Sequence, residues 1–248
     1  MDAADQSEAQ VPLPGLGRPP GRPFPVGAKT GFMGLLVAAA GTLFTTILIS
    51  IGFTAGGVED LRDNHAFVLV VTLAQDAVFV IVAYALTVEG GLVSAGTFGL
   101  RPFGRTALKT MAVAFGAYWA LTLLYSALIT PPCDELPDDL GVHESAVLAT
   151  LAGILVIGVA PVAEEFFFRG FIFQALRRSW GVWLAAPASG LIFGLLHFDL
   201  DKLVPLAILG TALAYVFHRT RSLVPCMLLH ALNNTFAFIF LLSGSAGC

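Results

Sequence analysis

Three charged residues lie close together inside a hydrophobic stretch of the chain. Glu164 and Glu165 are adjacent, and Arg169 follows Glu165 after one helical turn. A charged side chain near the middle of a bilayer costs roughly 2.5–3.5 kcal/mol on insertion scales. Such groups must therefore lie in a polar cavity inside the protein, and within membranes they generally mark functional sites.

Two histidines and an asparagine in later hydrophobic stretches supply the other groups that a hydrolytic site needs. His197 comes first, and His230 and Asn234 follow at i,i+4 spacing, which places both on one helix face. A carboxylate beside an imidazole can hold and deprotonate water. A second histidine and an asparagine amide can donate hydrogen bonds to a tetrahedral oxyanion. The set therefore suits hydrolysis of a peptide bond inside a membrane.

The composition requires that these residues are carried by membrane-spanning helices. The chain has 248 residues, of which 56% are hydrophobic and 12% charged, with a mean hydropathy of +0.82. Soluble domains are about a quarter charged. We therefore expect an all-α, polytopic transmembrane helical bundle whose environment is the lipid bilayer, and no nucleic-acid partner.

Seven segments have the length and apolar character of a span, which needs about 20 apolar residues. They are residues 31–53, 66–88, 107–130, 146–176, 182–198, 203–217 and 223–242. The fourth is too long for a simple span, so it should extend beyond the bilayer or break near Pro161. If it divides, the chain has eight spans.

The organisation that follows has four parts. Residues 1–30 are rich in Pro and Gly and predict a disordered cytoplasmic tail. Residues 31–145 hold three spans without a recognisable motif, residues 146–242 hold the catalytic core, and residues 243–248 form a short outer tail. With the N-terminus in the cytoplasm, cytoplasmic segments carry ten of the 13 Lys and Arg and outer loops two. This bias favours that orientation in a bacterial-type plasma membrane.

Depth along the helices tests whether the polar residues can meet. Counted from the cytoplasmic ends at 1.5 Å per residue, Glu164 and Asn234 lie roughly 20 Å deep and His230 about 14 Å. His197 lies about 28 Å deep, some 8 Å too far out. A tilted or broken helix is therefore required to bring His197 to the site.

The three motifs together resemble a known family. Glu164-Glu165-x-x-x-Arg169, Phe193-x-x-x-His197 and His230-x-x-x-Asn234 are similar in order and spacing to the signature of the type II CAAX prenyl endopeptidases. Their relatives are the CAAX protease and bacteriocin-processing (CPBP) intramembrane proteases, also called the abortive-infection family. The resemblance covers residues 146–242.

The resemblance implies roles for individual residues. Glu164 would be the general base, His197 would help to position the attacking water, and His230 and Asn234 would stabilise the oxyanion. Glu165 and Arg169 would be a supporting pair. The family has been described both as glutamate proteases and as metalloproteases, so no cofactor is certain. Zinc is the candidate metal, with Glu164, His197 and His230 as its ligands. The substrate would be a membrane-associated peptide or protein, with or without a prenyl group.

Other functions remain open at this point. The chain could be a non-catalytic membrane scaffold, or an immunity factor that binds peptides in the same groove. A proton-coupled transporter is a third possibility, although no inverted repeat is visible. A serine protease dyad of Ser189 and His197 is disfavoured, because the two lie eight residues apart on one predicted helix, about 12 Å. Small residues around Gly190 more simply permit close helix packing.

Two further features carry weaker predictions. Asp76 lies within the second span, where a structural contact is favoured over a role in lining a water path. Cys133 and Cys248 both face the outer side in this topology, but nothing brings them together, so we do not expect a disulfide between them.

Overall fold

The computed structural model is built from helices alone in the residues that it describes, which are 24–61, 63–91, 93–129 and 141–242. The first half contains α1 (Ala28–Ala55), α2 (His65–Glu89), the short α3 (Ala95–Phe98) and α4 (Arg105–Leu128). The second half contains one long composite helix followed by α9 (Val182–Leu195), α10 (Leu203–Thr220) and α11 (Val224–Leu242). The expected all-α transmembrane bundle is confirmed.

The composite helix corresponds to the fourth predicted span. It runs without a break through α6 (Ala146–Gly153), η1 (Ile154–Val159), α7 (Ala160–Phe167), η2 (Phe168–Phe173) and α8 (Gln174–Trp180). At 1.5 Å per residue it is about 50 Å long, more than the hydrocarbon thickness. The segment therefore extends beyond a bilayer rather than dividing, and the described residues give no eighth span.

The two π-helical segments, η1 and η2, flank the helix that carries the glutamates. Pro161 lies in the first turn of α7, directly after η1. The helix accommodates the proline there, so the break expected near Pro161 is not found. Single π-turns within α-helices are frequent at functional sites. Here they bracket Glu164 and Glu165, and Arg169 lies in η2.

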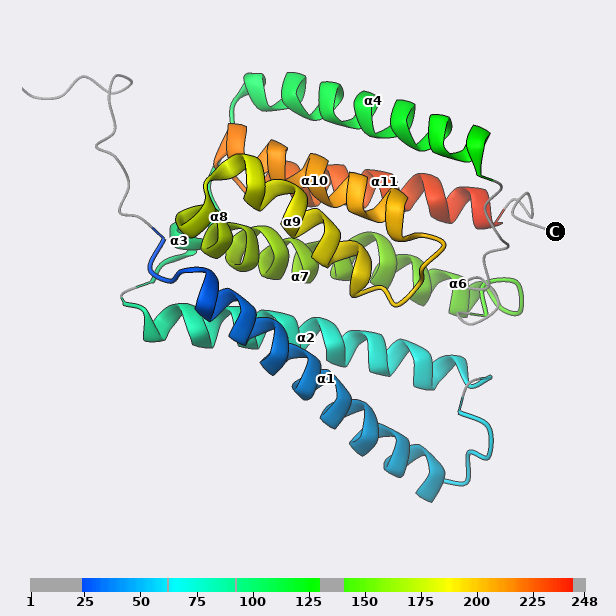
Figure 1. Ribbon diagram of the computed structural model, residues 1–248. Helices are drawn as coiled ribbons and strands as arrows, with labels where there is room; N and C mark the ends of the chain where they lie inside the picture. Colours follow the sequence, from blue (N-terminus) through cyan, green and yellow to red (C-terminus); the bar gives the residue numbers. More distant parts are fainter. Residues whose placement is uncertain (1–23, 62, 92, 130–140, 243–248) are drawn as a thin grey trace, which may run out of the picture.

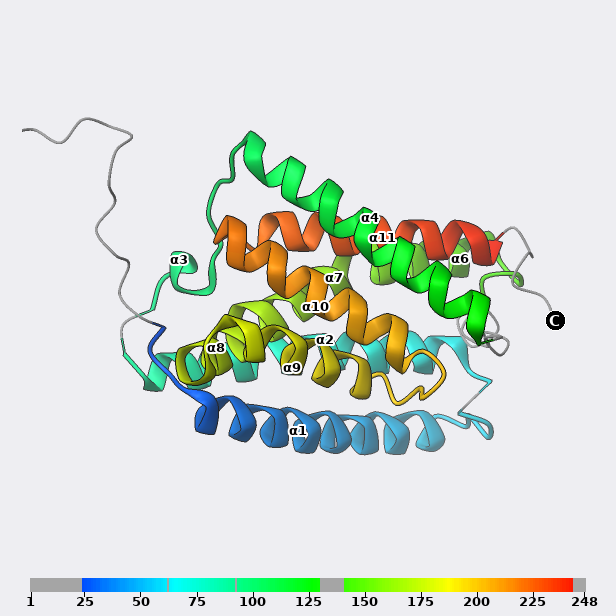
Figure 2. The same cartoon turned by 45° about the horizontal axis from the view of Figure 1, so that its top comes forward.

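The helices pack in two groups around the composite helix (Figure 1). On one side, α2 packs against α7, and α1 packs against both α2 and α8. On the other side, α9 packs against α10, and α4 crosses over α10 and α11 (Figure 2). Phe167, Phe168, Phe171 and Phe173 of the composite helix are at most 1% exposed, so they form the centre of the core.

Small residues allow the closest contact, between α9 and α10. A Cβ on Gly190 would lie 2.5 Å from the backbone oxygen of Ala207, and a Cβ on Gly210 would lie 2.7 Å from the Cα of Gly190. Both distances are shorter than real contacts allow. The prediction that small residues near Gly190 serve close packing is confirmed.

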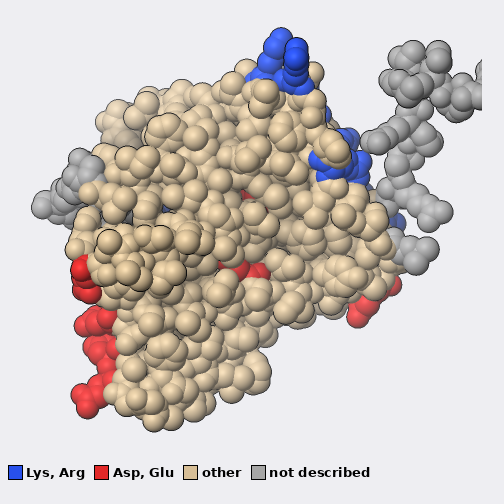
Figure 3. Space-filling model, turned by 180° about the vertical axis from the view of Figure 1, so that it is seen from behind, with Lys and Arg blue, Asp and Glu red and all other residues tan. Residues whose placement is uncertain are grey.

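The surface has the character expected for a membrane protein. Among the described residues, five helices are long and apolar enough to span a bilayer, while α9 and residues Val224–Phe240 of α11 are shorter apolar helices. Figure 3 shows the Lys and Arg side chains gathered at one end of the visible face and separated from most acidic side chains by a broad uncharged belt. A few acidic atoms are visible in the middle of that belt.

The predicted boundary of the N-terminal tail differs from the structure. The predicted tail ended at residue 30, but Phe24 and Val26 are buried in the core and α1 begins at Ala28. Arg178 donates hydrogen bonds to the backbone oxygens of Phe24 and Pro25, which holds this segment against α8. The rest of the predicted tail, residues 1–23, lies outside the described residues, as do residues 243–248.

Candidate active site

Glu165 and Arg169 form an ion pair in the interior of the protein. Arg169 Nη1 lies 2.7 Å from Glu165 Oε1, and both side chains are fully buried. The i,i+4 spacing places them on one face of the composite helix, as the sequence indicated. The two charges therefore neutralise each other along their own helix.

Arg169 also links the composite helix to its neighbours. Its Nη2 donates to the backbone oxygen of Gly210 at 3.1 Å, which ties η2 to α10. Its guanidinium lies 4.7 Å from the centre of the Phe193 ring on α9, within the range of a cation–π interaction. Arg169 thus fixes the position of the glutamate helix relative to α9 and α10.

His230 brings α11 to the two glutamates. Its Nδ1 lies 3.0 Å from Glu165 Oε1, while its Nε2 lies 3.9 Å from Glu164 Oε2. The first distance is a hydrogen bond and the second is too long for one. Because a carboxylate can only accept, we assign the Nδ1 hydrogen to the bond with Glu165. The other ring nitrogen then lies on the side of Glu164.

Glu164 differs from Glu165 in its surroundings. Its side chain is 15% exposed, whereas that of Glu165 is fully buried. Its Oε2 atom is nevertheless buried and has no hydrogen-bond partner among the described residues. A polar contact longer than about 3.5 Å is the usual setting for a bridging water. Oε2 of Glu164 and Nε2 of His230 are therefore placed to bind the same water molecule.

His197 lies beyond the end of α9, at the surface of the molecule. The helix ends at Leu195, and the next residues turn sharply, with Phe198 at φ 54°. The predicted span 182–198 is therefore too long, because His197 lies in the turn that follows the helix. His197 Nδ1 lies 2.7 Å from the backbone oxygen of Phe193, so Nδ1 carries the hydrogen and Nε2 is left as the acceptor of the neutral ring.

The Phe193 ring connects the two histidines. Its centre is 4.7 Å from that of the His197 ring and 5.6 Å from that of the His230 ring, both with edge-to-face geometry. No direct hydrogen bond joins His197 to Glu164 in the part of the chain that is described. His197 and His230 therefore both contact the Phe193 ring, but His197 is more exposed than the other residues of the predicted site.

Asn234 makes an interhelical hydrogen bond. Its Nδ2 donates to the backbone oxygen of Val156 in η1 at 2.9 Å. A π-turn disturbs the regular i to i−4 hydrogen bonds, and the Asn234 amide supplies a partner to one carbonyl of this turn. One hydrogen of the amide group is used in this contact, and the other is available to a ligand.

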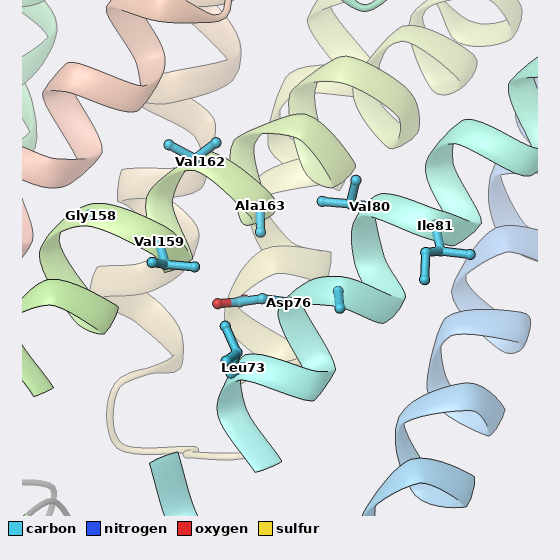
Figure 4. A pocket seen from close by; sticks show the side chains of 9 residues that line it. Leu73, Asp76, Val80, Ile81, Gly158, Val159, Val162 and Ala163 are labelled. Carbon is cyan, nitrogen blue, oxygen red and sulfur yellow. The ribbon is translucent and has the colours of Figure 1, made fainter. Parts of the chain in front are cut away.

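Asp76 is a polar residue near the site whose position the sequence did not reveal. It is 2% exposed, and neither carboxylate oxygen has a hydrogen-bond partner among the described residues. It lies within electrostatic range of Glu164 and His230. The structural contact favoured from the sequence is therefore not found. Figure 4 shows the Asp76 side chain pointing into a pocket between α2 and the η1–α7 segment.

The residues suggested as zinc ligands do not form a recognisable metal site. No three His, Cys, Asp or Glu side chains are grouped to hold a metal ion in the part of the chain that the structure describes. Glu164 and His230 approach each other, but His197 is turned toward the Phe193 carbonyl. This arrangement does not fit a three-ligand zinc site.

The predictions about serine and cysteine concern residues apart from this site. Ser189 is fully buried within α9 and has no hydrogen-bond partner among the described side chains. Cys226 is a free, buried cysteine. Cys133 and Cys248 lie outside the described residues, so the absence of a disulfide between them stays a prediction.

Comparison with known proteins places the site within a family. Residues 146–236 match the family model described as type II CAAX prenyl endopeptidase Rce1-like. We refer to this matched segment, which is similar to that family, as the Rce1-like domain. It contains every residue of the predicted catalytic set, from Glu164 to Asn234, and the description of the model names an endopeptidase. Asp76 lies outside the Rce1-like domain, in a part of the chain that the family model does not match.

Individual relatives agree with this assignment over short stretches. The Bacillus subtilis (strain 168) protein named "Putative membrane peptidase YdiL" is 35% identical over 81 residues, which is 33% of either chain. The UPF0177 protein YaiF of Lactococcus lactis subsp. lactis (strain IL1403) is 32% identical over 83 residues, 33% of this chain and 37% of that protein. The match thus spans about a third of each curated relative. No solved structure matches this chain.

Proposed function

We propose that this protein is an intramembrane endopeptidase that hydrolyses peptide bonds of membrane-associated or lipidated substrates with water activated by Glu164. The observation that carries the proposal is the position of Glu164 Oε2, which is buried, has no hydrogen-bond partner among the described residues and lies 3.9 Å from Nε2 of His230. Oε1 of Glu165 already accepts from Arg169 and His230, and the side chain is fully buried, although its Oε2 has no partner among the described residues. The Glu164 side chain is 15% exposed, so Glu164 is the carboxylate that water and a substrate can reach.

The proposed reaction begins with a water molecule held between Oε2 of Glu164 and Nε2 of His230. Glu164 takes one proton from the water while the water oxygen attacks the peptide carbonyl. His197, with Nε2 as an acceptor, orients the water from the exposed side of the site. Glu164 then passes the proton to the leaving nitrogen as the carbon–nitrogen bond breaks, which restores the carboxylate.

The oxyanion formed by this attack requires hydrogen-bond donors. One candidate is the second amide hydrogen of Asn234. The other is Nε2 of His230 in the imidazolium form, in which both ring nitrogens carry a hydrogen. Each such donor contributes about 10²–10³ in rate when it is positioned beforehand. The bonds from Asn234 to Val156 and from His230 to Glu165 provide that positioning, because they hold both side chains before a substrate arrives.

The setting of the reaction is also part of the proposal. The N-terminus would lie in the cytoplasm and the protein in the plasma membrane, as the distribution of Lys and Arg indicates. Substrates would be membrane peptides or proteins, and prenylated C-termini are one class to test.

Purified protein in liposomes would be incubated with a quenched fluorescent peptide library that includes prenylated members. Cleavage by the wild type and its loss in Glu164→Gln is the expected result. A Glu164→Gln protein that cleaves at the wild-type rate would refute the mechanism. Cleavage of prenylated members alone would identify the substrate class.

A further inference from the structure

The pocket that contains Asp76 is an apolar groove with one acidic group. It has a volume of about 590 Å³ and lies between α2 and the η1–α7 segment. Leu73, Ile81 and Val162 line it and are also more than half exposed on the outer surface. In a membrane these side chains face lipid, so the groove opens sideways toward the hydrocarbon.

Asp76 is unusual in this apolar setting. A buried polar group is normally hydrogen-bonded, and a buried carboxylate without partners is strongly unfavourable. Within the described part of the chain, both oxygens of Asp76 lack a hydrogen-bond partner, while the rest of the lining residues are hydrophobic or glycine. A group that binds Asp76 in this groove must bring its own hydrogen-bond donor. A lipid acyl chain has no donor, whereas a peptide main chain has one at almost every residue.

The groove lies next to the proposed catalytic residues, although none of them lines it. Ala163, directly before Glu164, lines it, and Asp76 interacts electrostatically with Glu164 and His230. Largely apolar walls with a few polar groups are typical of ligand sites, which occupy about 300–1,000 Å³. A peptide in this groove would pass beside Glu164.

We infer that the groove between α2 and α7 binds an apolar peptide segment that enters from the bilayer, and that Asp76 accepts a hydrogen bond from its main chain. The inference rests on the proposed peptidase function and adds the binding surface for its substrate. A peptide lying extended in a membrane has unpaired N–H groups, each of which is costly in hydrocarbon. Asp76 supplies a hydrogen-bond acceptor near Glu164, the proposed general base. Thus a residue outside the Rce1-like domain would position the substrate.

Two variants separate this role from a structural one. Asp76→Leu removes the acceptor and should leave the protein at least as stable as the wild type, because an unpartnered buried carboxylate is lost. Gly158→Phe fills the groove from η1, where an added Cβ meets nothing within 4 Å. Gly116→Phe on α4 is the matched control, because Gly116 has the same free space and does not line the groove.

The test measures binding without cleavage. Each variant would be made in the Glu164→Gln background, and the Kd of a short fluorescent Leu/Ala peptide would be measured in liposomes. Asp76→Leu and Gly158→Phe should each raise the Kd roughly tenfold or more. Asp76→Asn, which retains one acceptor oxygen, and Gly116→Phe should stay within about threefold of the background protein.

Two results of this binding measurement would overturn the inference. If Asp76→Leu and Gly158→Phe bind the peptide like the background protein, the groove does not hold the peptide, and the inference is overturned. If only Gly158→Phe weakens binding, the peptide lies in the groove without Asp76 as its anchor, which also contradicts the inference. Failure of the proposed peptidase function would show separately, as absence of cleavage by the wild type.

Discussion

His230 donates from Nδ1 to Oε1 of Glu165 over 3.0 Å, although the two residues are 65 positions apart in the chain. This bond connects α11 to the composite helix and makes Glu165 the common partner of His230 and Arg169. The two adjacent glutamates are thereby separated in role. Oε1 of Glu165 accepts both of these bonds, whereas the more exposed Glu164 makes only a long, 3.9 Å approach to His230.

Glu165→Ala should destabilise the protein strongly. It would leave the fully buried Arg169 without its counter-charge, and breaking a buried ion pair in this way typically costs 3–5 kcal/mol. We expect a reduced folded yield and a lower melting temperature in detergent. The double variant Glu165→Leu/Arg169→Met removes both charges and should recover part of the lost stability. Equal stability of Glu165→Ala and the wild type would show that the pair does not support the fold.

Asn234→Ala should affect catalysis more than stability. The lost hydrogen bond to Val156 is an interhelical bond in a membrane protein, and such bonds contribute about 0.6 kcal/mol on average and at most about 1.7. Loss of an oxyanion donor should lower kcat by about 10²–10³. Melting temperature and kcat would be measured on the same preparation. A kcat close to the wild-type value would restrict Asn234 to helix packing.

Gly190→Leu should disrupt the packing of α9 on α10. Its Cβ alone would come within 2.5 Å of the Ala207 backbone oxygen, which no rotamer can relieve. Overpacking of this kind typically costs 1–3 kcal/mol or more. The control is Gly52→Leu in α1, where a Cβ meets nothing within 4 Å. Thermal unfolding should show a clear loss for Gly190→Leu and little change for Gly52→Leu, and equal values would argue against a tight contact here.

Chelation should leave cleavage intact. The described residues form no group of three metal-ligating side chains, and His197 is hydrogen-bonded to Phe193 instead of facing Glu164 and His230. Protein treated with a zinc chelator and then freed of it should cleave peptide at the untreated rate. Loss of activity that returns on adding zinc would instead show that a metal takes part.

The sequence predicted the helices and the local pairs well, because both follow from short-range patterns. Each of the seven apolar segments became a helix or a composite helix, and the i,i+4 spacing correctly paired Glu165 with Arg169. Small residues around Gly190 correctly indicated close packing. These features depend on hydrophobic length, helical periodicity and side-chain size, which can be read without knowing the fold.

The remaining features of the site depend on contacts between distant segments. The bond between His230 and Glu165 and the approach of Asp76 to the site both arise from helix packing, for which one sequence carries no direct signal. The unpartnered state of Asp76 was likewise unpredictable, since a polar residue in a span usually finds a partner. Its one signal was the presence of a carboxylate among apolar residues in the second span.

The most direct test of the central claim is the single-turnover cleavage rate of Glu164→Gln against that of the wild type, in liposomes and on a peptide that the wild type cleaves. Glutamine keeps the size of the side chain and removes the base, so the melting temperature should be nearly unchanged. We predict a fall in rate of about 10²–10⁴, the usual contribution of a general base. A Glu164→Gln protein that cleaves as fast as the wild type would contradict the account.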